Sequence, residues 1–242
     1  MSAVTWLILK RELAAYTRTM SGYVIIALAL FIDGILFNTV GLGGAEKLSA
    51  TVLSEFFFLT SGVTMIAAVF LSMRLLAEEK QTGTLVLLTS SPVRDWEVIL
   101  GKFFSAWIFL AIMILLTGFM PALIMINGKL SIGHVLVGYL GLLLLGGAAL
   151  ALGTLASALA RSQVLAAIIS GCFVVGLILM WMVARVTEHP LNQIFENLAL
   201  YHRHFPPFQR GTLHLRDVVY YLALIYFALF CATRVLEARR WR

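Results

Sequence analysis

Long apolar runs alternate with short polar segments along the 242-residue chain. A helix needs about 20 apolar residues to cross the hydrocarbon core of a bilayer. The chain has six runs of this kind, which predict an all-α integral membrane protein with six transmembrane helices. We place these helices, within a single transmembrane domain over residues 1–242, at residues 21–40, 53–75, 103–126, 133–160, 163–184 and 217–236.

Composition agrees with this pattern. Hydrophobic residues make up 61% of the chain and charged residues 12%, whereas charged residues make up about a quarter of a typical soluble domain. Cys172 and Cys231 lie in separate apolar runs, where we expect packing residues rather than a disulfide. The sequence therefore excludes an ordinary soluble domain.

The distribution of Lys and Arg orients the six spans. Both termini lie on one side of the membrane, and that side carries twelve of the eighteen Lys and Arg residues. Because cytoplasmic loops carry the excess of positive charge, we predict that both termini and the loop over 76–102 are cytoplasmic. Residues 185–216 then form an outer loop. The net charge of +6 reflects this topology and contact with membrane lipid, not nucleic-acid binding.

Residues 1–20 have helical periodicity outside the spans. Apolar side chains recur every three or four positions at Trp6, Leu9, Leu13 and Tyr16. The charged residues, which are mostly on the other side, are Lys10, Arg11, Glu12 and Arg18. This pattern predicts an amphipathic helix that lies flat on the cytoplasmic membrane surface.

The outer loop at 185–216 also contains a helical pattern. We expect a short amphipathic helix resting on the outer surface before the last span, stopped by Pro206-Pro207. Its apolar positions are Leu191, Ile194, Phe195, Leu198 and Tyr201. The loop also holds His189, His202, His204 and His214. No Cys or carboxylate set with metal-ligand spacing accompanies them, so we expect solvent-facing His residues and no metal site.

Two features inside the spans leave alternatives open. Small residues let membrane helices approach closely, and the fourth span is rich in them, at Gly138, Gly141, Gly146, Gly147 and Gly153. They predict tight packing, either within the subunit or across a dimer. Asp33 interrupts the first span at mid-depth, where a charge is costly. It is either a residue of a transport pathway or subunit contact, or a protonated or hydrogen-bonded packing residue.

The chain shows no catalytic constellation and no nucleotide-binding motif. The stretch GLGGAEKLS at 41–49 resembles a phosphate-binding loop, but it has Glu46 where that motif requires Gly before Lys47. We therefore expect no enzyme activity and no cofactor in this chain itself. An intramembrane enzyme is poorly supported, because Asp33 is the only acid at mid-membrane depth and has no evident partner.

The cytoplasmic loop at 76–102 is long, charged and patterned, which a simple connector between two spans does not need to be. Glu78 and Glu79 favour a helix N-terminus, Gly83 favours a kink or a close approach to another backbone, and Ser91-Pro92 predicts the start of a second helix. These features indicate a helical elbow that docks a cytoplasmic partner.

Two stretches of the chain resemble type-2 ABC exporter permeases. The first is LLAEEKQTGTLVLLTSSPVRDWEVILGKF at 75–103, which is similar to the first cytoplasmic loop of that family. The second, at 204–241, is similar to the last span, and is closest to the bacterial gliding-motility permease subgroup. The resemblance implies a cytoplasmic coupling helix that docks an ABC ATPase subunit. It maps onto Glu78, Glu79, Lys80, Gln81, Thr82, Gly83, Thr84 and Leu85.

The resemblance further implies a half-transporter in the bacterial inner membrane. Two permease chains, identical or different, pair to form the pathway, and the separate ATPase subunit binds ATP and Mg²⁺. An accessory protein on the outer side is a further expected partner. A second hypothesis remains, in which the chain is a membrane scaffold that recruits a cytoplasmic partner through the same loop without moving a substrate. The sequence does not select a substrate.

Overall fold

The computed structural model describes residues 3–41, 48–83, 93–127 and 130–240. The described residues are mostly helical and contain no strand, and six of their helices are long and apolar enough to cross a membrane. The predicted all-α membrane fold is therefore confirmed. The helices are α1 (Ala3–Arg18), α2 (Met20–Leu36) with a π-helical extension η1 (Phe37–Gly41), α3 (Ser49–Ser72), α4 (Ala77–Gln81), α6 (Asp95–Leu116), α7 (Phe119–Asn127), α8 (Ile132–Leu159), α9 (Gln163–Val186), α10 (Leu191–Leu198), α11 (Pro206–Gln209) and α12 (Leu215–Arg240).

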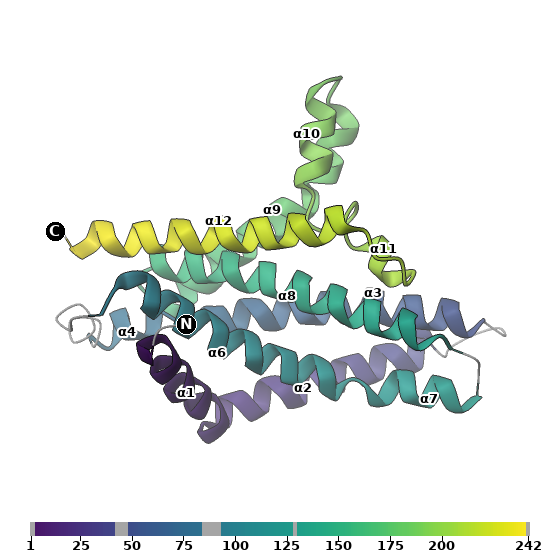
Figure 1. Cartoon of the computed structure of the whole chain (residues 1–242), viewed down its shortest axis with the longest axis horizontal. Coiled ribbons are helices and arrows are strands. Elements are labelled where there is room, and N and C mark those ends of the chain that lie inside the picture. Colours follow the sequence, from purple (N-terminus) through teal and green to yellow (C-terminus); the bar gives the residue numbers. More distant parts are fainter. Residues whose placement is uncertain (1–2, 42–47, 84–92, 128–129, 241–242) are drawn as a thin grey trace.

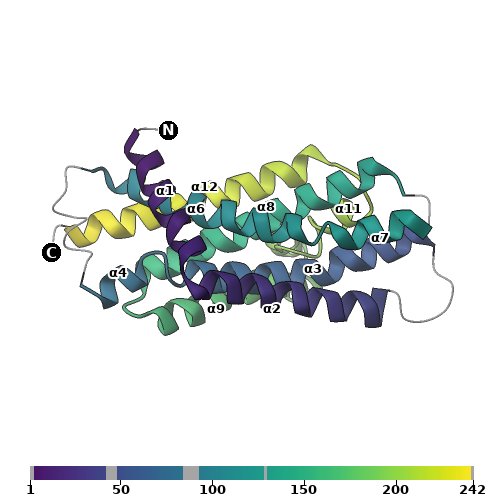
Figure 2. The ribbon, with the colours of Figure 1, turned by 90° about the horizontal axis from the view of Figure 1, so that it is seen from below.

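The long helices lie side by side, and α8 packs against α3, α6, α9, α11 and α12 (Figure 1). α1 crosses the bundle at one end (Figure 2). Figures 1 and 2 place α4 and the two chain ends toward this same end of the molecule. This arrangement agrees with the predicted topology, in which these three parts share one side of the membrane.

The glycines of α8 pack against other helices of the same chain. A Cβ atom at Gly138 would collide with the ring of Phe57 on α3, and one at Gly153 would collide with Ser72. Gly146 leaves room for Leu110 of α6 in the same way. The close approach that the sequence predicts therefore occurs within the subunit, where these glycines make α8 the centre of the bundle.

The predicted span at 103–126 is formed by two helices instead of one. α6 ends at Leu116 and α7 begins at Phe119. Between them, the Thr117 hydroxyl donates to the carbonyl of Ile114 at 2.7 Å and lies 3.2 Å from the Tyr139 hydroxyl of α8. Since Thr117 and Gly118 are small and apolar enough for a span, hydropathy alone does not reveal this break.

α6 also begins later than expected. Ser91-Pro92, the predicted helix start, lies outside the described residues, and Arg94 precedes the first turn at Asp95. The carboxylate of Glu97 accepts a hydrogen bond from the backbone N–H of Arg94 at 3.3 Å. This contact satisfies a backbone donor that a helix N-terminus leaves unpaired, and so it fixes the start of α6 at this point.

α1 is helical as predicted, and one of its faces packs against the bundle. It packs on α6 through Ile8 and Tyr16, and Leu9 is also buried, whereas Trp6 is 50% exposed. Leu9 and Tyr16 of the predicted apolar stripe are thus buried by the bundle, whereas Trp6 does not join this packing. Glu12, expected on the polar side, turns toward the bundle instead.

The outer loop contains the expected helix, α10, which packs on α9. It projects away from the bundle of long helices (Figure 1). It ends at Leu198, so Tyr201 lies beyond it, and Pro206-Pro207 does not stop it. Those two prolines begin α11 instead. Proline fits the first turn of a helix because the N–H that it lacks would be unpaired there.

Candidate functional site

The predicted coupling segment is a short helix fixed to the end of the bundle. α3 ends at Ser72, a turn follows over 73–76, and α4 occupies Ala77–Gln81. The backbone N–H groups of Leu76 and Ala77 donate to the hydroxyl of Ser157 on α8, at 3.0 and 2.9 Å. One buried side chain therefore satisfies two donors at the start of α4 and ties this helix to α8.

Lys80 makes the second attachment to α8. Its ammonium donates to the carbonyls of Ser157 and Ala160, both at 3.0 Å, and to that of Ala158. These carbonyls belong to the last turn of α8 and the residue after it, where carbonyls have no partner in the helix. A positive charge is favourable at this position because the C-terminus of a helix carries partial negative charge. Lys80 thus caps α8 while it holds α4 in place.

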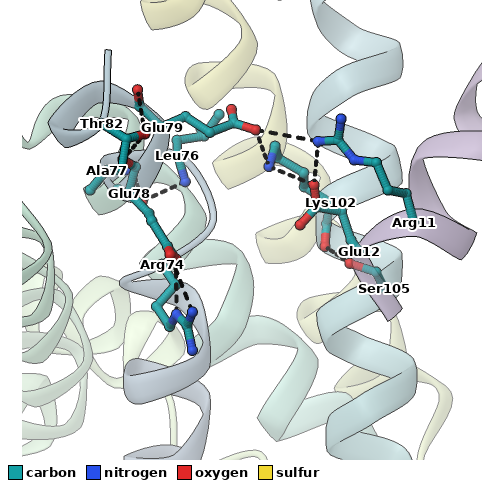
Figure 3. Close-up of polar contacts among 11 residues, drawn as sticks. Arg11, Glu12, Arg74, Leu76, Ala77, Glu78, Glu79, Thr82, Lys102 and Ser105 are labelled. Carbon is teal, nitrogen blue, oxygen red and sulfur yellow. Dashed lines mark hydrogen bonds and ion pairs between the residues drawn. The ribbon is translucent and has the colours of Figure 1, made fainter. Parts of the chain in front are cut away.

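Glu79 connects α4 to two other helices (Figure 3). Its carboxylate lies 2.8 Å from the ammonium of Lys102 on α6, and Lys102 lies 3.1 Å from Glu12 on α1. Arg11 completes this cluster, 2.9 Å from Glu12 and 3.6 Å from Glu79. The Lys102 side chain is only 3% exposed. A buried ammonium thus bridges two carboxylates, and α1, α4 and α6 meet at one point.

The electrostatics of this ionic cluster favour the ionised form of Glu12. Partial burial raises the pKa of Glu12, but the charge of Lys102 and the hydrogen bonds from Arg11 and Lys102 outweigh burial and lower this pKa below its ordinary value.

Arg74 and Glu78 form a separate ion pair one helical turn apart, with Nε of Arg74 and Oε2 of Glu78 2.9 Å apart. Glu78 and Glu79 therefore stabilise the elbow itself.

The remaining described part of the segment faces outward. Gln81, Thr82 and Gly83 are exposed. Gly83 has a φ of 75°, the left-handed conformation that favours glycine, and a Cβ there would meet nothing within 4 Å. The predicted kink is therefore present, and the chain itself makes no close approach to Gly83. Thr84 and Leu85, the other two predicted docking residues, lie outside the described residues.

Asp33 lies apart from this site, on α2. It is 2% exposed, and neither carboxylate oxygen has a hydrogen-bond partner among the described residues. The hydroxyl of Thr60 on α3 is likewise buried without a partner. Burial of Asp33 inside a single chain argues against a contact between subunits, and its roles as a pathway residue or as a packing residue both stay predictions.

His204 is not solvent-facing, contrary to the expectation from sequence. It is buried, its Nδ1 lies 2.7 Å from Oδ1 of Asp217 on α12, and its ring stacks on Tyr220. Its Nε2 lies 3.1 Å from the carbonyl of Asn197. Within the described residues, no three His, Cys, Asp or Glu side chains are grouped as metal ligands. His204 therefore joins the end of α10 to the start of α12.

Sequence reasoning missed the residues that hold the coupling segment. Ser157 lies about 80 positions from its partners and Glu12 lies 90 positions from Lys102, so no local pattern relates them. Lys102 carries one signal, since it stands directly before the apolar residues of the third predicted span. A cation at such a position requires an anionic or polar partner.

Comparison with known proteins places most of the bundle in one family. The family described as "ABC-2 family transporter protein" matches residues 36–226, from the end of α2 into α12. The matched region includes α4 and Lys102, whereas α1 and all of α2 except Leu36 lie outside it. The comparison with curated proteins gives no match.

Proposed function

The chain belongs to the ABC-2 family of transporter proteins and is a permease component of an ABC transporter, and from this premise we propose that it is the membrane half of an ATP-driven exporter. In this proposal a separate ATPase subunit binds ATP and Mg²⁺ and docks on the coupling segment. Two permease chains form the pathway, either as a homodimer or as a heterodimer. The six membrane-capable helices make the chain a multi-pass membrane protein.

The finer features of the proposal rest on sequence. The Lys and Arg distribution supports cytoplasmic termini, and the loop and tail resemblance supports an exporter of the gliding-motility type in a bacterial inner membrane. An accessory protein on the outer side belongs to the same proposal. The family assignment favours transport over the scaffold hypothesis, since a permease moves a substrate.

One observation carries the coupling role, namely that α4 is exposed at its end and anchored at its base. Gln81, Thr82 and Gly83 offer a contact surface, while Lys80 fixes α4 to α8 and Glu79 fixes it to α1 and α6. A force on the exposed end therefore reaches three helices through charge-assisted hydrogen bonds, which are stronger than neutral ones. A flexible connector could not transmit such a force.

The mechanism that follows is a rigid-body movement. Closure of the ATPase subunits around ATP displaces α4, and α1, α6 and α8 move with it because they share the ionic cluster and the Ser157 anchor. The spans then tilt as a group and open the pathway toward the outside. Packed helices favour such discrete movements, because their interfaces do not deform continuously.

Copurification tests this function. The chain is expressed with a candidate ABC ATPase subunit, purified through a tag on the permease, and assayed for ATP hydrolysis with candidate cargo. We expect the ATPase to copurify and its hydrolysis to respond to cargo. Absence of the ATPase would contradict the coupling role, and copurification without a response to any cargo would support the scaffold hypothesis instead.

A further inference from the structure

A polar pocket of about 290 Å³ lies between the C-terminal end of α9, α10 and the turn that follows α10. It is far from α4 and has no part in the coupling role. Its principal lining residues are Trp181, Arg185, Asn192, Glu196, His202 and Arg203. Three basic side chains thus converge on one cavity, together with a single carboxylate.

The charges in this pocket do not cancel. Arg203 is neutralised by Glu196, whose Oε2 lies 3.1 Å from Nη1 of the arginine. The guanidinium of Arg185 lies 4.4 Å from the centre of the Trp181 ring, and it forms no ion pair with an acid among the described residues. A cation–π contact holds the guanidinium in position while its N–H donors remain available. The pocket therefore presents a positioned positive charge without an anion.

His202 and Asn192 supply further polar groups. The His202 ring stacks on Trp181 with ring centres 4.2 Å apart, and partial burial, followed by the charge of Arg185, lowers its pKa. A neutral imidazole has one N–H donor. The Oδ1 atom of Asn192 is buried without a hydrogen-bond partner among the described residues. An anion with acceptor oxygens and a neighbouring hydroxyl complements this set.

The pocket also lies where a membrane lipid would place such a group. Trp181 and Arg185 belong to the last two turns of the α9 span, and tryptophan is enriched at membrane–water interfaces. Leu179, Met182 and Val183 are exposed on the same part of α9. They provide an apolar surface for an acyl chain next to the charged pocket.

From this arrangement we infer that the pocket binds a phosphate ester, with Arg185 as the main contact to the phosphate. Arginine suits this ligand because its planar fork of N–H donors matches phosphate oxygens. The headgroup of a phospholipid and a soluble phosphate share this chemistry.

Calorimetry on the full chain in a maltoside detergent tests the site with two probes, dihexanoyl-phosphatidylglycerol and inorganic phosphate. We expect Arg185→Gln to weaken binding by about tenfold or more, since it removes a charge-assisted contact. Arg185→Lys retains the charge without the fork, and we expect an intermediate loss. Arg210→Gln is the matched control, because Arg210 is an exposed arginine of the same outer loop.

The two probes separate the sources of the ligand. Much tighter binding of the lipid supports a headgroup site, and equal binding of both probes supports a soluble phosphate. The inference is overturned if neither probe binds the wild-type chain. It is also overturned if Arg185→Gln and Arg210→Gln have equal effects, because binding would then reflect surface charge alone.

Discussion

Lys102 is the residue on which the ionic cluster depends, because it stands between Glu12 and Glu79 with 3% of its side chain exposed. Lys102→Met leaves two neighbouring carboxylates without their shared cation. Breaking a buried ion pair in this way costs about 3–5 kcal/mol, so we predict a loss of that order in the free energy of unfolding. The measurement is SDS-induced unfolding in mixed micelles, followed by circular dichroism.

Arg11→Gln is the control for this prediction. Arg11 contacts the same two carboxylates, but its side chain is 63% exposed, and exposed ion pairs contribute about 1 kcal/mol or less. We therefore expect a small change. Equal losses in the free energy of unfolding for the Lys102 and Arg11 variants would contradict the prediction, because they would show that burial of Lys102 does not strengthen the cluster.

At the scale of residues, the sequence predicts the role of a single residue better than it predicts which two residues are in contact. Gly83 was predicted to mark a kink, and it has a φ of 75°, because a glycine among helix formers is a local signal. Glu12 was placed on the wrong face, because its partner Lys102 is brought near only by the packing of α1 on α6. The roles of Glu79 and Lys80 as anchors depend on the same distant contacts.

Among the elements, α4 transmits movement in our account, and Gly83 lies in the exposed turn that follows it. Gly83→Val places a β-branched residue at a positive φ, which is strained, and it fills the space around the exposed turn. We predict that this variant inserts normally but loses most of the ATPase activation, or most of the copurified ATPase. Proteoliposomes containing the permease and the ATPase provide the measurement.

Gly62→Val is the matched variant, because a Cβ at Gly62 on α3 also meets nothing within 4 Å and no left-handed conformation is involved. We expect it to behave like the wild-type chain. Normal coupling in Gly83→Val would contradict the assignment of this turn to the docking surface. A similar loss of ATPase activation in Gly83→Val and Gly62→Val would show that the effect does not depend on the docking surface.

Element types follow from sequence more reliably than element ends. Apolar runs identify the spans because the bilayer demands length and hydrophobicity. The break at Thr117–Gly118 keeps the hydropathy of a span, and therefore it is invisible to this criterion. Pro206-Pro207 signals a helix boundary in either direction, since proline both stops a helix and fits its first turn. Here it begins α11.

For the whole molecule, the arrangement of the spans depends on α8. Its glycines allow α3 and α6 to approach closely, and its C-terminal end receives Lys80 of α4. The sequence indicates the tight packing through these glycines but not its partners, because small residues serve equally within a subunit and between subunits. The end of the central helix is thus also the base of the coupling segment.

The most direct test of the central claim is photo-crosslinking from the exposed end of α4. A photoreactive amino acid replaces Gln81 in the permease coexpressed with its ATPase. A second variant carries it at Arg210, directly after α11, which lies at the other end of the bundle from α4 (Figure 1). The account predicts a covalent adduct between permease and ATPase from position 81 and none from position 210. An ATPase that copurifies yet forms no adduct from position 81, or forms equal adducts from both positions, would contradict it.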